Sequence, residues 1–164
     1  MGLYSGYGLG GAMRAPQCRT HRSPAGFLKV ATPLLATSPV AHNVIYGVAS
    51  RLANAGDGAD DAFFATAEDD GLAVGVAMRT PPRDAVIGGD WSRSRDTLVT
   101  ALYAHSPSLP GIQGPPGEAA AFADQWARHT RCQVIHGMRL RLFKLIEVTT
   151  PRACPGHPPP NCRR

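Results

Sequence analysis

A turn signal between two apolar segments most constrains what this 164-residue chain can fold into. Asp69-Asp70-Gly71 separates the segments 62–68 and 72–79, and an Asp-Gly pair at such a place is typical of a tight β-hairpin turn. Within 72–79, valines and a methionine alternate with glycine and alanine, which is the two-residue period of a strand. The sequence therefore predicts an antiparallel hairpin inside a larger sheet.

Helix and strand signals continue on both sides of this hairpin. Ser23-Pro24 and Ser38-Pro39 each predict the start of a helix, because serine caps a helix and proline suits its first position. We expect Pro33 to bend or end the first of these helices. The other predicted elements are an edge strand within 15–22, a strand at 85–87, a helix at 91–105 with Leu98, Leu102 and Trp91 facing inward, an extended piece at 110–113, a helix at 117–130 carrying Phe122 and Trp126, and a long final strand at 133–148.

This order predicts an α/β (α+β) fold, in which a mixed, mainly antiparallel sheet is flanked by about four helices. The length suits one domain with a proper core. We expect residues 1–20 to be a flexible leader or edge strand, residues 21–150 to be the domain, and the Pro-rich residues 151–164 to be a linker or tail. In the final segment Arg139 and Arg141 alternate with apolar residues, which predicts one buried and one solvated strand face.

Composition and charge exclude several classes of protein. The chain has no apolar run of about 18 residues, as a membrane span requires, and its start lacks the apolar region of a signal peptide. Four cysteines are too few for a disulfide scaffold. Basic residues are spread over both ends of the chain rather than interleaved with aromatic ones, so we do not expect nucleic-acid binding. We expect a cytoplasmic protein, and its Arg-, Ala- and Gly-rich composition is typical of a GC-rich bacterial genome.

Six short strings follow one another in this element order. They are Pro24-Ala25-Gly26-Phe27-Leu28, His42-Asn43-Val44-Ile45-Tyr46-Gly47, Phe64-Ala65-Thr66-Ala67-Glu68-Asp69-Asp70-Gly71, residues 75–82, Leu109-Pro110-Gly111-Ile112-Gln113-Gly114-Pro115 and Met138-Arg139-Leu140-Arg141-Leu142-Phe143. Together they resemble the GNAT superfamily of N-acetyltransferases, and in particular the N-terminal domain of bacterial acetyltransferases that carry two such domains in tandem. The resemblance covers about residues 21–157. It implies a GNAT-like fold, and acetyl transfer from acetyl-CoA to an amine in full-length relatives.

The resemblance also implies where the cofactor acetyl-CoA would bind. In this family a turn with the pattern Gln/Arg-x-x-Gly-x-Gly/Ala and the following helix N-terminus hold the pyrophosphate, and no Gln or Arg of this chain has that spacing. The corresponding loop reads Gly88-Gly89-Asp90, and we expect Asp90 to cap the helix and repel a pyrophosphate. We therefore expect weak or no binding of acetyl-CoA. The resemblance further implies that the catalytic domain would begin where this chain stops, so we expect a truncated product that docks to a GNAT catalytic domain or forms a homodimer.

Few side chains are candidates for catalysis. Enzymes of this family use a Glu as general base and a Tyr near the last strands as acid, but the only late glutamates are Glu118 and Glu147, and no Tyr follows Tyr103. We interpret Glu118 as a residue that interacts favourably with the positive N-terminal end of its helix, and Glu147 as the last residue of a strand. His42, on a predicted helix, is interpreted as an interface or packing residue. No catalytic or cofactor-binding residue is assigned.

Two other patterns have a functional and a structural interpretation. Cys18 with His21, Cys132 with His136, and Cys154 with His157 and Cys162 resemble groups of zinc ligands. A structural zinc site needs four ligands, whereas the Cys154 group offers three and the other pairs are distant in the sequence, so no metal site is expected. Gly-rich residues 6–11 lack the strand and helix of a dinucleotide site. The alternative to the acetyltransferase-related function is a free-standing adaptor or dimerisation module that binds a protein partner through its last strand.

Overall fold

A five-stranded sheet forms the centre of the computed structural model, which describes residues 15–55 and 61–148. Its strands are β1 (Gln17–Thr20), β2 (Phe63–Asp69), β3 (Leu72–Arg79), β4 (Ala85–Gly89) and β5 (Ile112–Gln113), and they lie side by side in chain order. Strands β1 to β4 are antiparallel to their neighbours, whereas β5 runs parallel to β4. The predicted fold class, a mixed and mainly antiparallel sheet with four helices, is confirmed.

The hairpin between β2 and β3 is formed as the sequence predicts. Asp69 lies opposite Leu72, and the two residues between them, Asp70 and Gly71, both have positive φ angles of 47° and 81°. These angles match a two-residue hairpin turn, which Asp and Gly adopt readily. The edge strand β1 pairs with β2 and lies inside the predicted range 15–22.

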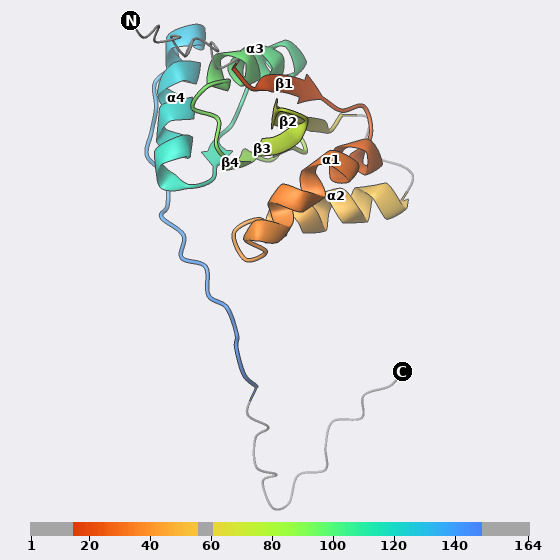
Figure 1. The fold of residues 1–164 in the computed structure, drawn as a ribbon. Coiled ribbons are helices and arrows are strands. Elements are labelled where there is room, and N and C mark those ends of the chain that lie inside the picture. The colour runs from red at the N-terminus through yellow and green to blue at the C-terminus, as the bar shows by residue number, and fades with distance from the viewer. Residues whose placement is uncertain (1–14, 56–60, 149–164) are drawn as a thin grey trace, which may run out of the picture.

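Four helices cover the two faces of the sheet. Helices α1 (Pro24–Thr37) and α2 (Asn43–Ala55) pack on one face, and α3 (Arg95–His105) and α4 (Pro116–Thr130) lie on the other (Figure 1). Alternate residues of β2 and β3 point to the two sides, so each face has its own core. Buried residues of the α1/α2 side include Phe27, Ile45, Phe64 and Val76, and those of the α3/α4 side include Trp91, Leu98, Leu102, Phe122 and Trp126.

The predictions for the first two helices are confirmed in part. Ser23 caps α1, as predicted, by accepting a hydrogen bond from the Gly26 N–H at 3.1 Å. Pro33 does not end this helix: it lies on the exposed side, where water can solvate the carbonyl that its missing N–H leaves free. The predicted helix start at Ser38-Pro39 is wrong, because an isolated turn closed by the His42 N–H and the Ser38 carbonyl precedes α2, which begins at Asn43.

The predicted final strand at 133–148 is wrong. After α4 the chain turns at Arg131, whose φ is 61°, and residues 131–148 have no helix or strand. This part of the chain first runs back along α4 and then extends away from the domain (Figure 1). Every residue from Cys132 to Val148 is exposed. The apolar residues that alternate with Arg139 and Arg141 therefore do not form a buried strand face. Alternation gives this segment the pattern of a strand, but a strand also needs a neighbour to pair with its backbone groups.

The expected ends of the chain fall mainly outside the described residues. This holds for the leader at 1–14 and for the Pro-rich residues 149–164. Among residues 15–55 and 61–148, no helix is long and apolar enough to cross a membrane.

Candidate functional site

The turn that joins β4 to α3 is held tightly against the neighbouring strand β3. Gly89 has a φ of 74°, and a Cβ atom placed on it would lie 2.3 Å from the carbonyl oxygen of Val74, so only glycine fits. The next residue, Asp90, donates its backbone N–H to that same carbonyl at 2.7 Å. Trp91 is fully buried and donates its indole N–H to the Val76 carbonyl at 3.2 Å. Three consecutive residues, Gly89, Asp90 and Trp91, therefore hold the turn against β3.

The expectation that Asp90 caps the following helix is wrong. Helix α3 begins at Arg95 with Ser94 as its N-cap, because residues 92–94 form a separate turn. The Asp90 carboxylate instead accepts a hydrogen bond from the Ser92 backbone N–H at 2.8 Å. Hydrogen bonding from Ser92 lowers the pKa of Asp90 below its usual range, so this carboxylate is charged at neutral pH. A negative charge thus lies in the turn, but it leaves the N–H groups of the α3 N-terminus free.

The start of α3 carries two cationic side chains, each already bound to a carboxylate. Arg93 lies 3.2 Å from Asp69, and Arg95 lies 2.9 Å from Glu118 at the start of α4. The Ser94 hydroxyl is buried and has no hydrogen-bond partner within the described part of the chain. The helix end is electropositive, but Asp69, Asp90 and Glu118 balance the charges around it. An anion bound here would have to compete with these carboxylates.

His42 lies on the other face of the sheet, against β4. Its Nδ1 atom lies 3.2 Å from the Leu35 carbonyl and donates a hydrogen bond to it. A Cβ atom on Gly88 would lie within 3.0 Å of Nε2, so the ring packs directly on the strand. The residue is 7% exposed. His42 lies in the turn before α2 rather than on a helix, and it packs between the last turn of α1 and β4. A packing role is the interpretation that the sequence favoured over a catalytic base.

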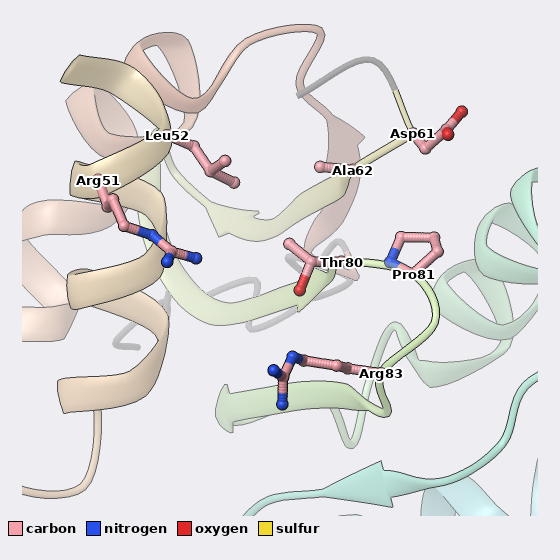
Figure 2. Close-up of a pocket in the computed structure, with 7 residues that line it drawn as sticks. All are labelled: Arg51, Leu52, Asp61, Ala62, Thr80, Pro81 and Arg83. Atoms are coloured by element: carbon pink, nitrogen blue, oxygen red, sulfur yellow. The ribbon is translucent and has the colours of Figure 1, made fainter. Parts of the chain in front are cut away.

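A cavity of about 420 Å³ lies between the end of α2 and the β3–β4 loop (Figure 2). Arg51 and Arg83 both reach toward this space, and the Thr80 side chain lies between them, whereas the Asp61 carboxylate points away. Within residues 15–55 and 61–148, neither guanidinium has a carboxylate partner. The cavity could hold a small anionic group, and Leu52 provides an apolar wall.

The glutamates that the sequence offered as catalytic candidates do not come together. The Glu118 carboxylate binds Arg95 and thereby connects α4 to α3, which is a structural role. Glu147 lies in the exposed segment after α4 and does not end a strand. Neither lies beside His42, which is on the opposite face of the sheet.

The Cys and His pairs do not form a metal site among the described residues. The His21 Nε2 atom forms a hydrogen bond with the Thr66 hydroxyl at 2.9 Å and does not form a pair of metal ligands with Cys18. Burial raises the pKa of the Cys18 thiol to about 11, so it is protonated at neutral pH and a poor ligand. Cys132 is exposed, and the group of Cys154, His157 and Cys162 lies outside the described residues.

Sequence reasoning missed the contacts that join distant segments. The Arg95–Glu118 pair spans 23 residues, and the cavity brings Arg51 and Arg83 together from separate elements. No local pattern marks such pairs in a single sequence. Comparison with known proteins adds no further assignment, since no protein-family profile, no curated protein and no solved structure matches this chain.

Proposed function

We propose that this chain is a GNAT-like, non-catalytic domain, corresponding to the N-terminal one of two acetyltransferase-related domains in tandem. The observation that carries the proposal is the order of elements, with four antiparallel strands, then α3, then a strand parallel to β4, then α4. The resemblance rests on this order together with the six strings named above. The order from β1 to α4 supports it, whereas the last expected strand is not formed.

The residues around the β4–α3 turn support a domain without a working cofactor site. When the last position of the pattern Gln/Arg-x-x-Gly-x-Gly/Ala is placed on Arg95, the first helical residue, its first position falls on Asp90 and its glycine on Arg93. A carboxylate replaces the polar or cationic side chain, and two long side chains replace the small residues that let backbone and phosphate approach. All three positions of the pattern are therefore occupied by unsuitable residues.

Two candidate side chains, Glu118 and His42, are not placed to act as the general base of acyl transfer. Glu118 is engaged by Arg95, and the Nε2 side of the His42 ring is packed against Gly88. A general base needs to reach the proton it removes within hydrogen-bond distance. The domain would then contribute to acetyl transfer by docking to a catalytic domain, while the acetyl-CoA is bound there.

Isothermal titration of the chain with acetyl-CoA tests this proposal. We expect no saturable heat of binding and no consumption of acetyl-CoA when an amine is supplied. Binding with a micromolar Kd would show a working cofactor site and would overturn the non-catalytic assignment. Turnover of acetyl-CoA by the isolated chain would overturn it as well.

The exposed segment after α4 favours a second candidate function, an adaptor or dimerisation module. Ile135, Met138, Phe143 and Ile146 are each at least 85% exposed, and such a surface is typical of a protein–protein contact. We also propose a cytoplasmic location for either function, which the free thiols of Cys18 and Cys132 support. Recovery of one specific partner in a pull-down from the host would support the module, and a monomer without a partner would count against it.

A further inference from the structure

The loop between β3 and β4 is a closed turn that fixes one side of the cavity shown in Figure 2. The Arg83 backbone N–H donates a hydrogen bond to the Thr80 carbonyl at 3.0 Å, so the loop closes over Pro81 and Pro82. Because the two prolines each restrict their own φ angle, the turn has little backbone freedom. Arg79, which is only 6% exposed, donates its Nε–H to the Arg83 carbonyl at 3.4 Å and holds the turn from β3. Thr80 and Arg83 are therefore in place before any ligand binds.

Two guanidinium groups and one hydroxyl group converge on this cavity. Arg51 reaches it from α2, Arg83 reaches it from the turn, and the Thr80 side chain lies between them (Figure 2). Within residues 15–55 and 61–148, the Thr80 hydroxyl forms no hydrogen bond and neither guanidinium pairs with a carboxylate. Three groups that can donate hydrogen bonds thus face one space without a described acceptor.

The described carboxylates nearest to the cavity are directed elsewhere. Asp61 lies at its rim, but its carboxylate points away from the two guanidinium groups (Figure 2). Asp84, which follows Arg83, accepts a hydrogen bond from the Gln113 side chain at 2.9 Å and lies against Gly111. These two carboxylates therefore do not neutralise the cavity, and an anion between the guanidinium groups would relieve their mutual repulsion.

The set of donors favours a phosphate group over a carboxylate. One guanidinium binds two oxygen atoms at once through parallel N–H groups, so a single arginine already occupies both oxygens of a carboxylate. A phosphate monoester has three free oxygens, which can accept from both guanidinium groups and from the Thr80 hydroxyl. Its charge near neutral pH is about −1.5 to −2, which matches two arginines.

The remaining walls of the cavity suit the organic part of such an ester. Leu52 and Ala62 line it and are partly buried, and they supply apolar surface beside the donors. The volume of about 420 Å³ lies in the range of small-molecule sites. It leaves room for a small organic group next to the phosphate.

We propose that this cavity binds the phosphate group of a small phosphomonoester, held by Arg51, Arg83 and Thr80, with Leu52 against its organic part. The cavity lies where β3 ends and β4 begins, whereas the β4–α3 turn lies at the other end of these two antiparallel strands. The site is therefore separate from the turn that corresponds to the cofactor loop. The proposal goes beyond the proposed function and does not depend on it.

Amide chemical shifts of the isotope-labelled full chain, titrated with inorganic phosphate and with phenyl phosphate, test the site. We expect the amides of Arg51, Thr80 and Arg83 to shift and to saturate with both probes. Phenyl phosphate should bind more tightly, because its ring can cover Leu52. Arg51→Gln and Arg83→Gln should each weaken binding about tenfold to a hundredfold, since each removes hydrogen bonds to a charged group. Both side chains are exposed, so glutamine should not disturb the fold.

Arg128→Gln is the matched control, because it removes one exposed positive charge from α4 on the other face of the sheet. This variant should bind phosphate as the wild type does. An equal weakening by Arg128→Gln would show a general attraction of anions to a basic chain and would overturn the site. Wild-type shifts that do not saturate, or that saturate unchanged in Arg51→Gln or Arg83→Gln, would overturn it as well.

Two further probes test the chemical class of the ligand. Acetate that binds as tightly as inorganic phosphate would overturn the choice of phosphate, and phenyl phosphate that binds no more tightly than inorganic phosphate would overturn the contact with Leu52. Acetyl-CoA itself carries a phosphomonoester, and the shifted amides distinguish the two sites. Shifts at residues 80–83 would support the cavity, whereas shifts at residues 89–95 would contradict the proposed function alone.

Discussion

Replacement of Trp91 by Phe tests how the β4–α3 turn is anchored to the sheet. The Trp91 side chain is fully buried, lies against Gly75, and donates its indole N–H to the Val76 carbonyl at 3.2 Å. Phenylalanine keeps an aromatic ring in this place, but its ring is smaller by three atoms, one of which is the N–H nitrogen. The substitution therefore removes one hydrogen bond and leaves a small cavity in the core on the α3/α4 side.

The expected loss of stability is about 2–3 kcal/mol. The hydrogen bond contributes about 1 kcal/mol, and the unfilled space costs about 1–2 kcal/mol. For a domain of this size the change corresponds to a decrease in Tm of roughly 5–10 °C. Urea unfolding should be followed by far-ultraviolet circular dichroism, because the chain has only two tryptophans and each variant removes one of them.

Trp126→Phe is the matched control for this substitution. Trp126 is 6% exposed and stacks on Phe122, and no hydrogen bond from its indole N–H is found within the described residues. It should lose about 1–2 kcal/mol, from packing alone. If Trp91→Phe costs no more than Trp126→Phe, the bond to Val76 does not contribute to stability and the reasoning about the anchored turn is refuted.

Two further predictions concern ionisable groups. Burial raises the pKa of Cys18 to about 11, so iodoacetamide at neutral pH should label the exposed Cys132 much faster than Cys18 in peptide mass spectra, and equal rates would contradict the burial. Burial also lowers the pKa of His21, against the opposing effect of Glu68, so the unfolded chain takes up a proton at higher pH than the folded one. The free energy of unfolding should then fall as the pH drops below about 6.5, and His21→Gln should reduce this fall. Urea midpoints at about pH 7.5 and pH 5.5 measure the difference, and an unchanged fall in the variant would refute the assignment.

Local signals in the sequence were sufficient for much of the fold. The hairpin at Asp70-Gly71 follows from two residues that adopt positive φ angles, and the Ser23 cap follows from one side chain beside its own helix. Both features depend only on neighbours in the chain. The inward faces of Leu98 and Leu102 follow in the same way from helical spacing.

Features that depend on a distant partner could not be predicted in this way. Alternation at 138–148 shows that the segment suits a strand, but the two-residue strand β5 sets how much edge is available, and no local pattern reveals this. The site is similar: Gly88-Gly89-Asp90 was identified from sequence, but the turn at 92–94 that separates Asp90 from α3 was not. In the proposed acetyltransferase-related domain, this helix start places the phosphate-binding pattern on Asp90, Arg93 and Arg95.

Restoring that pattern gives the most direct test of the account, which holds that this is a GNAT-like domain with an unsuitable cofactor turn. The variant Asp90→Arg/Arg93→Gly/Arg95→Ala carries the full pattern at the start of α3, and circular dichroism would establish that it remains folded. Isothermal titration with acetyl-CoA should show saturable binding for this variant and none for the wild type. Micromolar binding by the wild type, or no binding by the folded variant, would contradict the account.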